Sequence, residues 1–440
     1  YRGNRALTRY EFAAGLYACL NSLAERLQPE DLAAIRRLQD EFAAELATLR
    51  GRVDALEART TELEANQFST TTKLAGEVVI APQYGEGGAL ADPQATLITR
   101  ARLNFNTSFS GDDLLVTQLE FGNEGEDIIG ANFPGAATVG GSSFSQFVDP
   151  GATDYSIVGG TSTPILRRLA YTFTLGDDFA VTVGPRLFPS DFVDVNSYAN
   201  NSAQDFSSGF FINNPLIINN VFDTFGGAGA AIDWKLGGSP FSIRATYVAV
   251  SANQVDAGSP VGGAATAIAP ATLVTNRGLL GDPYQGTVEL AFEPGDAFAV
   301  RLQYTSASVL EVKSDVLGVN AEVSLGPIGI FGRYGNGVLN GYGAQEGIDL
   351  APETWMGGVG IKDVFTPGSL LAVAVGQPFV GGEGAIPGTD ATQTNYEAFY
   401  KFAVSDNISV TPTFMMITDA NNSSASDTIY QGVLRTTFSF

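Results

Sequence analysis

The sequence predicts a mainly β protein: a 16-stranded antiparallel transmembrane β-barrel, preceded by an N-terminal helical fragment and a coiled coil. The last stretch, Tyr430–Phe440, alternates apolar and polar side chains, which point to opposite faces of a strand. The same alternation recurs upstream to give sixteen segments, and the connections between them alternate between short and long. An apolar outer face and a polar inner face, repeated in this way, are typical of a barrel that crosses an outer membrane.

Residues 1–28 are expected to be helical, because apolar residues recur there at helical spacing. Thr8 and Glu11 form the pattern of a capping box at a helix start. The apolar positions are Leu7, Phe12, Leu16, Cys19, Leu20 and Leu23. On the residues alone, a generic small helical piece remains the alternative.

Residues 29–68 are expected to form a coiled coil, beginning near Pro29, a residue favoured in the first helical turn. One position of the heptad holds Leu32, Gln39, Leu46, Val53 and Thr60, and the position three later holds Ile35, Phe42, Leu49, Leu56 and Leu63. A seam sustained over more than four heptads predicts a coiled coil. The chain has no second helix of this kind, so the seam implies an oligomer. The alternative is a single amphipathic helix packed on its own domain.

Residues 69–440 are expected to form the barrel, with an even number of strands, as single-chain bacterial barrels have. The expected strands are 73–82, 96–109, 113–122, 165–175, 179–185, 227–236, 240–251, 285–293, 297–306, 315–325, 328–334, 354–363, 369–377, 395–404, 407–417 and 428–440.

The connections between these strands are expected to alternate strictly between short and long. The short ones are rich in Gly, Pro, Asp and Asn, the residues of tight turns. The long ones lie near 123–164, 186–226, 252–284, 335–353 and 378–394. Long loops gathered on one side predict a membrane barrel with short turns in the periplasm and long loops outside. Both ends of the barrel domain, and the helical arm, then belong to the periplasmic side.

The alternation also assigns side chains to the inside of the barrel. A charge on the lipid face costs about 2–4 kcal/mol at the membrane midplane, so strand arginines are expected to face inward. The predicted pore-lining residues on strands are Arg100, Arg102, Arg168, Arg244, Arg301 and Arg333, and Glu120, Glu289, Glu322 and Glu397 share their parity. Sixteen strands normally enclose an aqueous channel. The alternative is that these charges form ion pairs across a filled interior.

The loop after the fifth expected strand is the candidate constriction. It is apolar for an exposed loop, with residues such as Phe188 and Phe210, so it should pack against the inner wall or, alternatively, at a subunit interface. We expect Arg186, Asp191 and Asp194 to lie near the narrowest point and to line the pore.

Composition excludes several classes of function. With no His and a single Cys, the chain lacks the commonest acid–base catalyst and metal ligand, so no enzyme activity and no cofactor are expected. A formal net charge of −23 excludes a basic nucleic-acid interface. The acidic runs at 112–113 and 124–127 suit a solvated surface better than Ca²⁺ binding. No apolar run of 18 residues predicts a transmembrane helix, and no signal peptide is recognised at the first residue.

Residues 2–13 resemble the second half of a surface-layer homology domain. Thr8-Arg9-Tyr10-Glu11 stands where that family has its Thr-Arg-Ala-Glu-like signature. In the family this arginine contacts an anionic cell-wall polysaccharide, and the resemblance implies the same role for Arg9. The first half of the domain is missing, so a mature or truncated chain with an incomplete site is expected.

The order of the three segments resembles the major outer-membrane porins of cyanobacteria, whose barrel is similar to carbohydrate-selective porins. The resemblance implies a homotrimer surrounded by outer-membrane lipid and tethered through its periplasmic arm to peptidoglycan-linked polysaccharide. The function then expected is passive diffusion of small hydrophilic solutes and inorganic ions, with sugars and iron both open. Few inward aromatic residues beyond Phe399 would serve a sugar site. The other hypothesis is a structural tether with a poorly conducting barrel.

Overall fold

The computed structural model describes residues 71–440, apart from 91, 124, 133–149, 158–162, 256–276, 310–311, 341–348 and 382–389. Before residue 71 it describes only scattered positions between 14 and 54, all of them helical. The chain divides into two units, Tyr1–Thr70 and Thr71–Phe440. Arg9 and most of the heptad seam lie outside the described residues, so the surface-layer homology domain and the coiled coil stay predictions. No helix among the described residues is long and apolar enough to cross a membrane.

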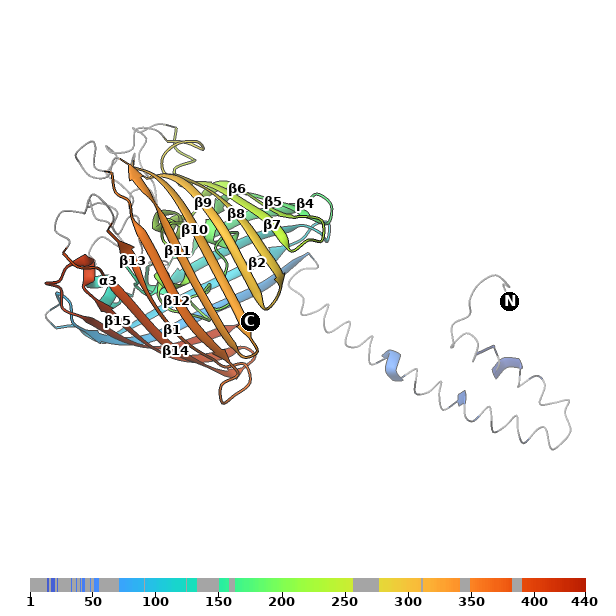
Figure 1. Ribbon diagram of the computed structural model, residues 1–440. Coiled ribbons are helices and arrows are strands. Elements are labelled where there is room, and N and C mark those ends of the chain that lie inside the picture. The colour runs from blue at the N-terminus through green and yellow to red at the C-terminus, as the bar shows by residue number, and fades with distance from the viewer. Residues whose placement is uncertain are drawn as a thin grey trace. The chain divides into compact units, whose positions relative to one another are not determined.

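Sixteen strands close into one antiparallel barrel, as the sequence predicts, and each strand pairs with its neighbours in sequence (Figure 1). The strands are β1 (Thr72–Glu86), β2 (Thr96–Thr107), β3 (Leu114–Gly122), β4 (Ile165–Thr174), β5 (Phe179–Leu187), β6 (Gly227–Lys235), β7 (Phe241–Ala249), β8 (Tyr284–Gly295), β9 (Phe298–Val309), β10 (Val312–Leu325), β11 (Ile328–Asn340), β12 (Glu353–Lys362), β13 (Leu370–Val380), β14 (Thr394–Ser405), β15 (Ile408–Thr418) and β16 (Ile429–Ser439). The described helical segments are α3 (Ile128–Asn132), α4 (Asp154–Ile157), η2 (Pro189–Asp191), α5 (Gly209–Ile212), α6 (Asn220–Phe225) and η3 (Ala420–Asn422).

Strand lengths depart from the prediction at one end of the barrel. We call the end with the short connections the turn side and the opposite end the loop side. On the loop side β11 continues to Asn340, six residues beyond its predicted end at 334. The expected strict alternation of connections is wrong at one place: β9 ends at Val309 and β10 begins at Val312. These two residues are themselves paired, so the strands stay hydrogen-bonded up to a tight connection and leave no long loop there.

The polarity of the barrel is reversed relative to a water-soluble protein. Large apolar side chains are exposed on its outer face, such as Leu302 (51%) and Leu434 (47%). Charged and polar side chains are buried inside, such as Arg100 (1%), Glu289 (0%) and Thr411 (0%). A lipid-facing surface around a polar interior is the arrangement that a membrane solvent requires. The predicted assignment of the two faces is therefore confirmed.

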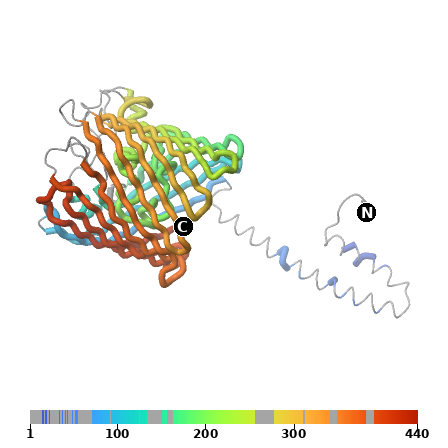
Figure 2. The backbone as a smooth tube through the Cα atoms, viewed as in Figure 1, coloured from blue at the N-terminus to red at the C-terminus, as the bar shows by residue number. Residues whose placement is uncertain are grey.

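The barrel closes where β16 meets β1, with Phe438 opposite Val78. Beyond that pair the backbone N–H groups of Phe440 and Gly76 donate to each other's carbonyls at 3.0 and 2.7 Å. The Phe440 ring lies over Gly76, where a Cβ would come within 2.2 Å of it. In Figure 2 the blue β1 and the red β16 run side by side. The first and last strands therefore seal the cylinder.

The segment between β5 and β6, residues 188–226, folds into the lumen, and we call it the inner loop. Most of it is buried, with Phe188, Phe206 and Phe210 fully so. Its apolar residues join clusters with inward side chains of the strands, for example Ile217 with Val316. In Figures 1 and 2 this green segment lies within the ring of strands. The prediction that the loop packs against the inner wall is confirmed.

Candidate functional site

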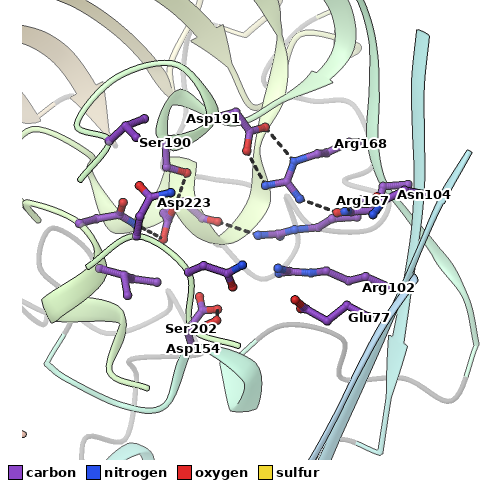
Figure 3. A pocket seen from close by; sticks show the side chains of 16 residues that line it. Glu77, Arg102, Asn104, Asp154, Arg167, Arg168, Ser190, Asp191, Ser202 and Asp223 are labelled. Atoms are coloured by element: carbon purple, nitrogen blue, oxygen red, sulfur yellow. Dashed lines mark hydrogen bonds and ion pairs between the residues drawn. The ribbon is translucent and has the colours of Figure 1, made fainter. Parts of the chain in front are cut away.

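The inner loop divides the lumen into a packed half and an open half. It is fastened to β8–β11, β14 and β16 along most of its length. A cavity of about 480 Å³ lies between it and the wall formed by β1–β4, which it meets through hydrogen bonds from strand arginines such as Arg167 and Arg168. The cavity is surrounded by Glu77, Arg102, Asn104, Gln118, Asp154, Arg167, Arg168, Ser190, Asp191, Val195, Asn200, Asn201, Ser202, Ile212, Asn213 and Asp223. Figure 3 shows the strand arginines pointing toward the acidic side chains of the loops.

One fastening of the packed half is an ion pair between Asp194 and Arg333. The two groups approach to 3.1 Å, and both side chains are fully buried. Asp194, held at φ 62°, also accepts hydrogen bonds from Gln303 and Asn320. Arg333 donates in addition to the backbone carbonyl of Ala199. Asp194 and Arg333 therefore line no open space in this structure, contrary to the expectation that both face the pore. They hold the loop in place.

A second fastening holds residues 205–208 of the inner loop. Glu397 on β14 accepts the backbone N–H groups of Ser207 and Ser208 at 2.5 and 3.0 Å. Arg435 on β16 donates to the carbonyl of Asp205 at 2.8 Å and to the Ser207 hydroxyl at 3.0 Å. Arg435 is fully buried and was not among the predicted site residues. Charged strand residues thus provide hydrogen-bond partners for backbone groups of the loop that would otherwise be buried without them.

Arg244 and Arg301 form a separate network on the inner wall of β7–β10. Arg244 pairs with Glu289 at 3.0 Å and Glu293 at 2.9 Å, and Arg301 pairs with Glu293 at 2.7 Å and Glu322 at 3.0 Å. Neither arginine lies around the cavity. These ion pairs join neighbouring strands along the wall, so the charges there are neutralised by each other and do not face the cavity.

The open half presents an arginine wall, which consists of Arg102, Arg167 and Arg168. A bulge in β4 allows two consecutive arginines to contribute: Gln118 lies opposite Arg168, the next residue of β3 lies opposite Leu166, and Arg167 is left over. The extra residue breaks the alternation, so both guanidinium groups face inward. The parity argument missed Arg167. The signal was present, because an Arg-Arg pair in a regular strand would place one charge in lipid.

Facing this wall is an acidic face made of Asp154 on α4, Asp191 on η2 and Asp223 on α6. Arg168 reaches across to Asp191 through two bonds, Nη2 to Oδ1 at 2.6 Å and Nε to Oδ2 at 2.7 Å. Both side chains keep some exposure, 19% and 30%. The pair is a strut between the wall and the inner loop at the edge of the cavity. Asp154 comes from a loop that the sequence did not place near the pore. Asp223 lies in the predicted constriction loop but was not among the predicted pore-lining residues.

Arg100 joins the two loops behind the cavity. It is fully buried, and its guanidinium lies 2.7 Å from Asp154 and 3.3 Å from Glu77. It also donates to the Ser202 hydroxyl at 3.3 Å, and Ser202 in turn donates to Asp154. One strand arginine therefore fixes α4 of the β3–β4 loop against the inner loop. The boundary of the cavity therefore depends on the positions of both loops.

The pKa values of the two half-buried loop carboxyls, Asp154 and Asp223, are shifted in opposite directions. Burial raises the pKa of the Asp223 carboxyl, and the negative charge of Asp154 raises it further. Burial alone would also raise the pKa of Asp154. There the charges of Arg100 and Arg102 and the hydrogen bond from Ser202 prevail and hold the pKa below its ordinary value. On acidification Asp223 is therefore neutralised first.

The remaining predicted residues lie away from the cavity. Arg186 sits where the register between β5 and β6 shifts, between Gly184 and Leu187, and it does not line the cavity. Asp127, in one of the acidic runs, accepts the backbone N–H groups of Thr153 and Gly130, so it orders the loop. Within the described part of the chain, no three carboxylate or thiol groups are placed to hold a metal ion.

None of the described residues around the cavity is aromatic. Phe399 and Phe331 do face inward, but Phe206 of the inner loop packs on both, with ring centroids 5.0 and 5.7 Å away. The cavity surface is instead rich in amides and hydroxyls, which offer hydrogen bonds without a stacking face.

Comparisons with known proteins agree with this architecture. Residues 29–440 match the family described as carbohydrate-selective porin, OprB family. An uncharacterized protein of Nostoc sp. (strain PCC 7120) is 34% identical, with all of this chain and 79% of that protein aligned. A second relative, from Synechocystis sp. (strain PCC 6803), is 29% identical over the whole chain and 84% of its own length. The high-pH structure of Pseudomonas putida OprB superposes with a TM-score of 0.59 at 13% identity, covering 86% of this chain and 96% of that one.

Proposed function

The chain belongs to the OprB family of carbohydrate-selective porins and is an outer-membrane channel, not an enzyme; we propose that solutes cross it between the arginine wall and the acidic face. The observation that carries this proposal is the cavity of about 480 Å³ bounded by charges of opposite sign. Such walls order water and orient dipolar solutes as they pass. The packed half of the lumen holds the inner loop away from the arginine wall, so that the passage stays open.

The solutes that this passage suits are small and hydrophilic. Amide groups of Asn104, Gln118 and Asn213, together with the flanking charges, can replace the hydrogen bonds that a sugar or a hydrated ion makes with water. The family description favours sugars, and the charged walls also admit inorganic ions. Because no aromatic ring of the described residues lines the cavity, hydrogen bonds rather than ring stacking would guide a sugar here.

Planar-bilayer conductance and liposome swelling test this proposal. The folded protein should conduct KCl, and liposomes containing it should swell in monosaccharides faster than in trisaccharides. Shortening Arg168 to Ala removes the strut to Asp191 and should raise swelling in the larger sugars. A folded, correctly inserted protein that stays electrically silent would overturn the proposal.

We also propose that residues 1–28 tether the barrel to peptidoglycan-linked polysaccharide, with Arg9 as a contact. The support is the resemblance of residues 2–13 to a surface-layer homology domain. The full chain should co-sediment with purified cell-wall sacculi that carry their polysaccharide, and Arg9→Ala should weaken this. Sacculi stripped of polysaccharide are the control. Equal sedimentation of residues 29–440 alone would contradict the tether.

The heptad seam within residues 29–68 supports a trimer assembled through a coiled coil. Native mass spectrometry in detergent should show three copies. Replacing the seam residues Leu46 and Leu49 by Asp should weaken the assembly more than the same change at the off-seam residues Ala47 and Thr48.

A second function, a tether with a poorly conducting barrel, is favoured by one observation: the inner loop fills much of the lumen with packed apolar clusters. The conductance measurement separates the two. If the tether is the main role, deleting residues 1–66 should detach the envelope while permeability stays unchanged.

A further inference from the structure

A second cavity, also of about 480 Å³, lies on the turn side of the barrel. Its wall is formed by inward residues of β14–β16, including Lys401 and Thr437, and Gln204 of the inner loop borders it. We call it the turn-side vestibule. It shares no lining residue with the cavity at the arginine wall, so it is a separate place along the lumen.

Lys401 is half-buried in this vestibule and makes no ion pair within 4 Å among the described residues. It shares the inward face of β14 with Glu397 and Phe399, which are buried against the inner loop. The charged groups near enough to act on it are Asp205, Arg435 and Lys362. Two of these three are cations, so the surroundings add positive charge to that of Lys401.

None of these three groups forms an ion pair with Lys401; the charge of Asp205 offsets one of the two neighbouring cations and leaves the other. The Asp205 carboxylate accepts the N–H groups of Asn200 and Asn201. Arg435 is fixed on carbonyls of the inner loop, including that of Asp205. The Lys362 ammonium lies 4.8 Å above the Tyr198 ring.

One carboxylate, Asp406, also lines the vestibule. It sits in the exposed turn between β14 and β15, where water and salt screen its charge. Lys401 lies deeper and is screened less, because part of its surface is withdrawn from solvent. The inner part of the vestibule is therefore electropositive.

We propose that the turn-side vestibule binds a small free oxyanion, phosphate being the probe of that class, through the Lys401 ammonium. The Gln204 amide, which borders the same space, can donate a hydrogen bond to it. The role of this site in permeation rests on the proposed channel function, but binding itself does not. In that role the vestibule holds anions at the turn-side mouth, after they have passed the mixed charges of the first cavity.

Binding is measured by the ³¹P line width of inorganic phosphate with the folded protein in detergent. The wild-type protein should broaden the line. Lys401→Gln should return it to the protein-free width, and Lys401→Arg should retain the broadening because it keeps the charge. Lys235→Gln is the matched control: Lys235 ends β6 on the turn side, is exposed and lines neither cavity. It should leave the broadening unchanged. Equal broadening with Lys401→Gln, or equal loss with Lys235→Gln, overturns the inference.

Conductance separates this inference from the proposed function. Phosphate added on the turn side alone should reduce KCl conductance in the wild-type protein and not in Lys401→Gln. Phosphate binding by a silent barrel would defeat the channel and leave the site intact. A conducting barrel that does not bind phosphate would support the channel and overturn the phosphate site.

Discussion

The packed and open halves of the lumen use the same residue types for different purposes. In the packed half, Arg333 and Asp194 are fully buried and bond to loop backbone and to each other. In the open half, Arg168 and Asp191 form a shorter pair, 2.6 Å against 3.1 Å, that remains partly exposed beside a cavity. Burial decides the outcome, because a desolvated charge must be fully paired whereas a hydrated one can exchange its partner for a passing solute.

The difference also explains why a barrel with so many charges can be both filled and open. The inner loop packs most of its buried apolar residues toward β8–β14, with the paired Asp194 among them, and leaves Asp191 and Asp223 toward the arginine wall. It is therefore amphipathic across the lumen. One face anchors the loop, and the other forms one side of the passage.

The largest effect should come from breaking the buried pair. Asp194→Ala leaves the Arg333 guanidinium buried without its carboxylate, which costs about 3–5 kcal/mol. The inner loop should leave the wall, lowering the temperature at which the folded barrel unfolds in detergent and raising single-channel conductance. Asp191→Ala is the matched control and should change the unfolding temperature little. Equal destabilisation by the two variants would erase the proposed contrast between the halves.

A steric change in the packed half should have the next largest effect. Gly329 on β11 faces Tyr198 of the inner loop, where a Cβ would lie 1.9 Å from the ring. Gly329→Val should displace the loop at a cost of about 1–3 kcal/mol, read from the same unfolding curve. Gly286→Ala, whose nearest neighbours lie 3.9 Å away, should be tolerated. If Gly329→Val unfolds like the wild-type protein, the loop is not seated on β11.

A charge change in the open half should alter selectivity and leave stability nearly intact. Arg168→Gln removes a cation and the strut to Asp191, at a cost of about 0–1 kcal/mol for a partly exposed pair. The reversal potential in a KCl gradient should shift toward cations. The same change at Arg244, away from the cavity, should shift it less. An unchanged reversal potential for Arg168→Gln would place the passage elsewhere.

The smallest expected effect is a dependence on pH. Burial and the charge of Asp154 raise the pKa of Asp223, so lowering the pH neutralises Asp223 before carboxyls of ordinary pKa. The acidic face then loses a negative charge, and selectivity should move toward anions as pH falls. Reversal potentials measured from pH 7 to pH 5 would show this shift. Asp223→Asn should remove this change of reversal potential with pH. If the variant shows the same pH dependence as the wild-type protein, Asp223 is not the group responsible.

Much of the barrel followed from the sequence, because alternation is a local property of a strand. The sixteen strands, their two faces and the inward course of the 188–226 segment needed only parity, turn residues and the cost of exposed Phe side chains. Arg102, Arg168 and Asp191 were predicted to line the pore and do surround the cavity. The parity rule failed at Arg167, where a bulge breaks the alternation.

The tertiary structure alone decided which half of the lumen stays open. Asp194 and Arg333 are 139 residues apart, and Asp154 reaches the cavity from a different loop than Asp191 and Asp223. No local pattern encodes these meetings, since they depend on how two loops share a confined space. The sequence by itself therefore determined the wall of the barrel. The packing of the loops against that wall determined the passage, because it decides which charged groups are buried, which are paired and which face open space.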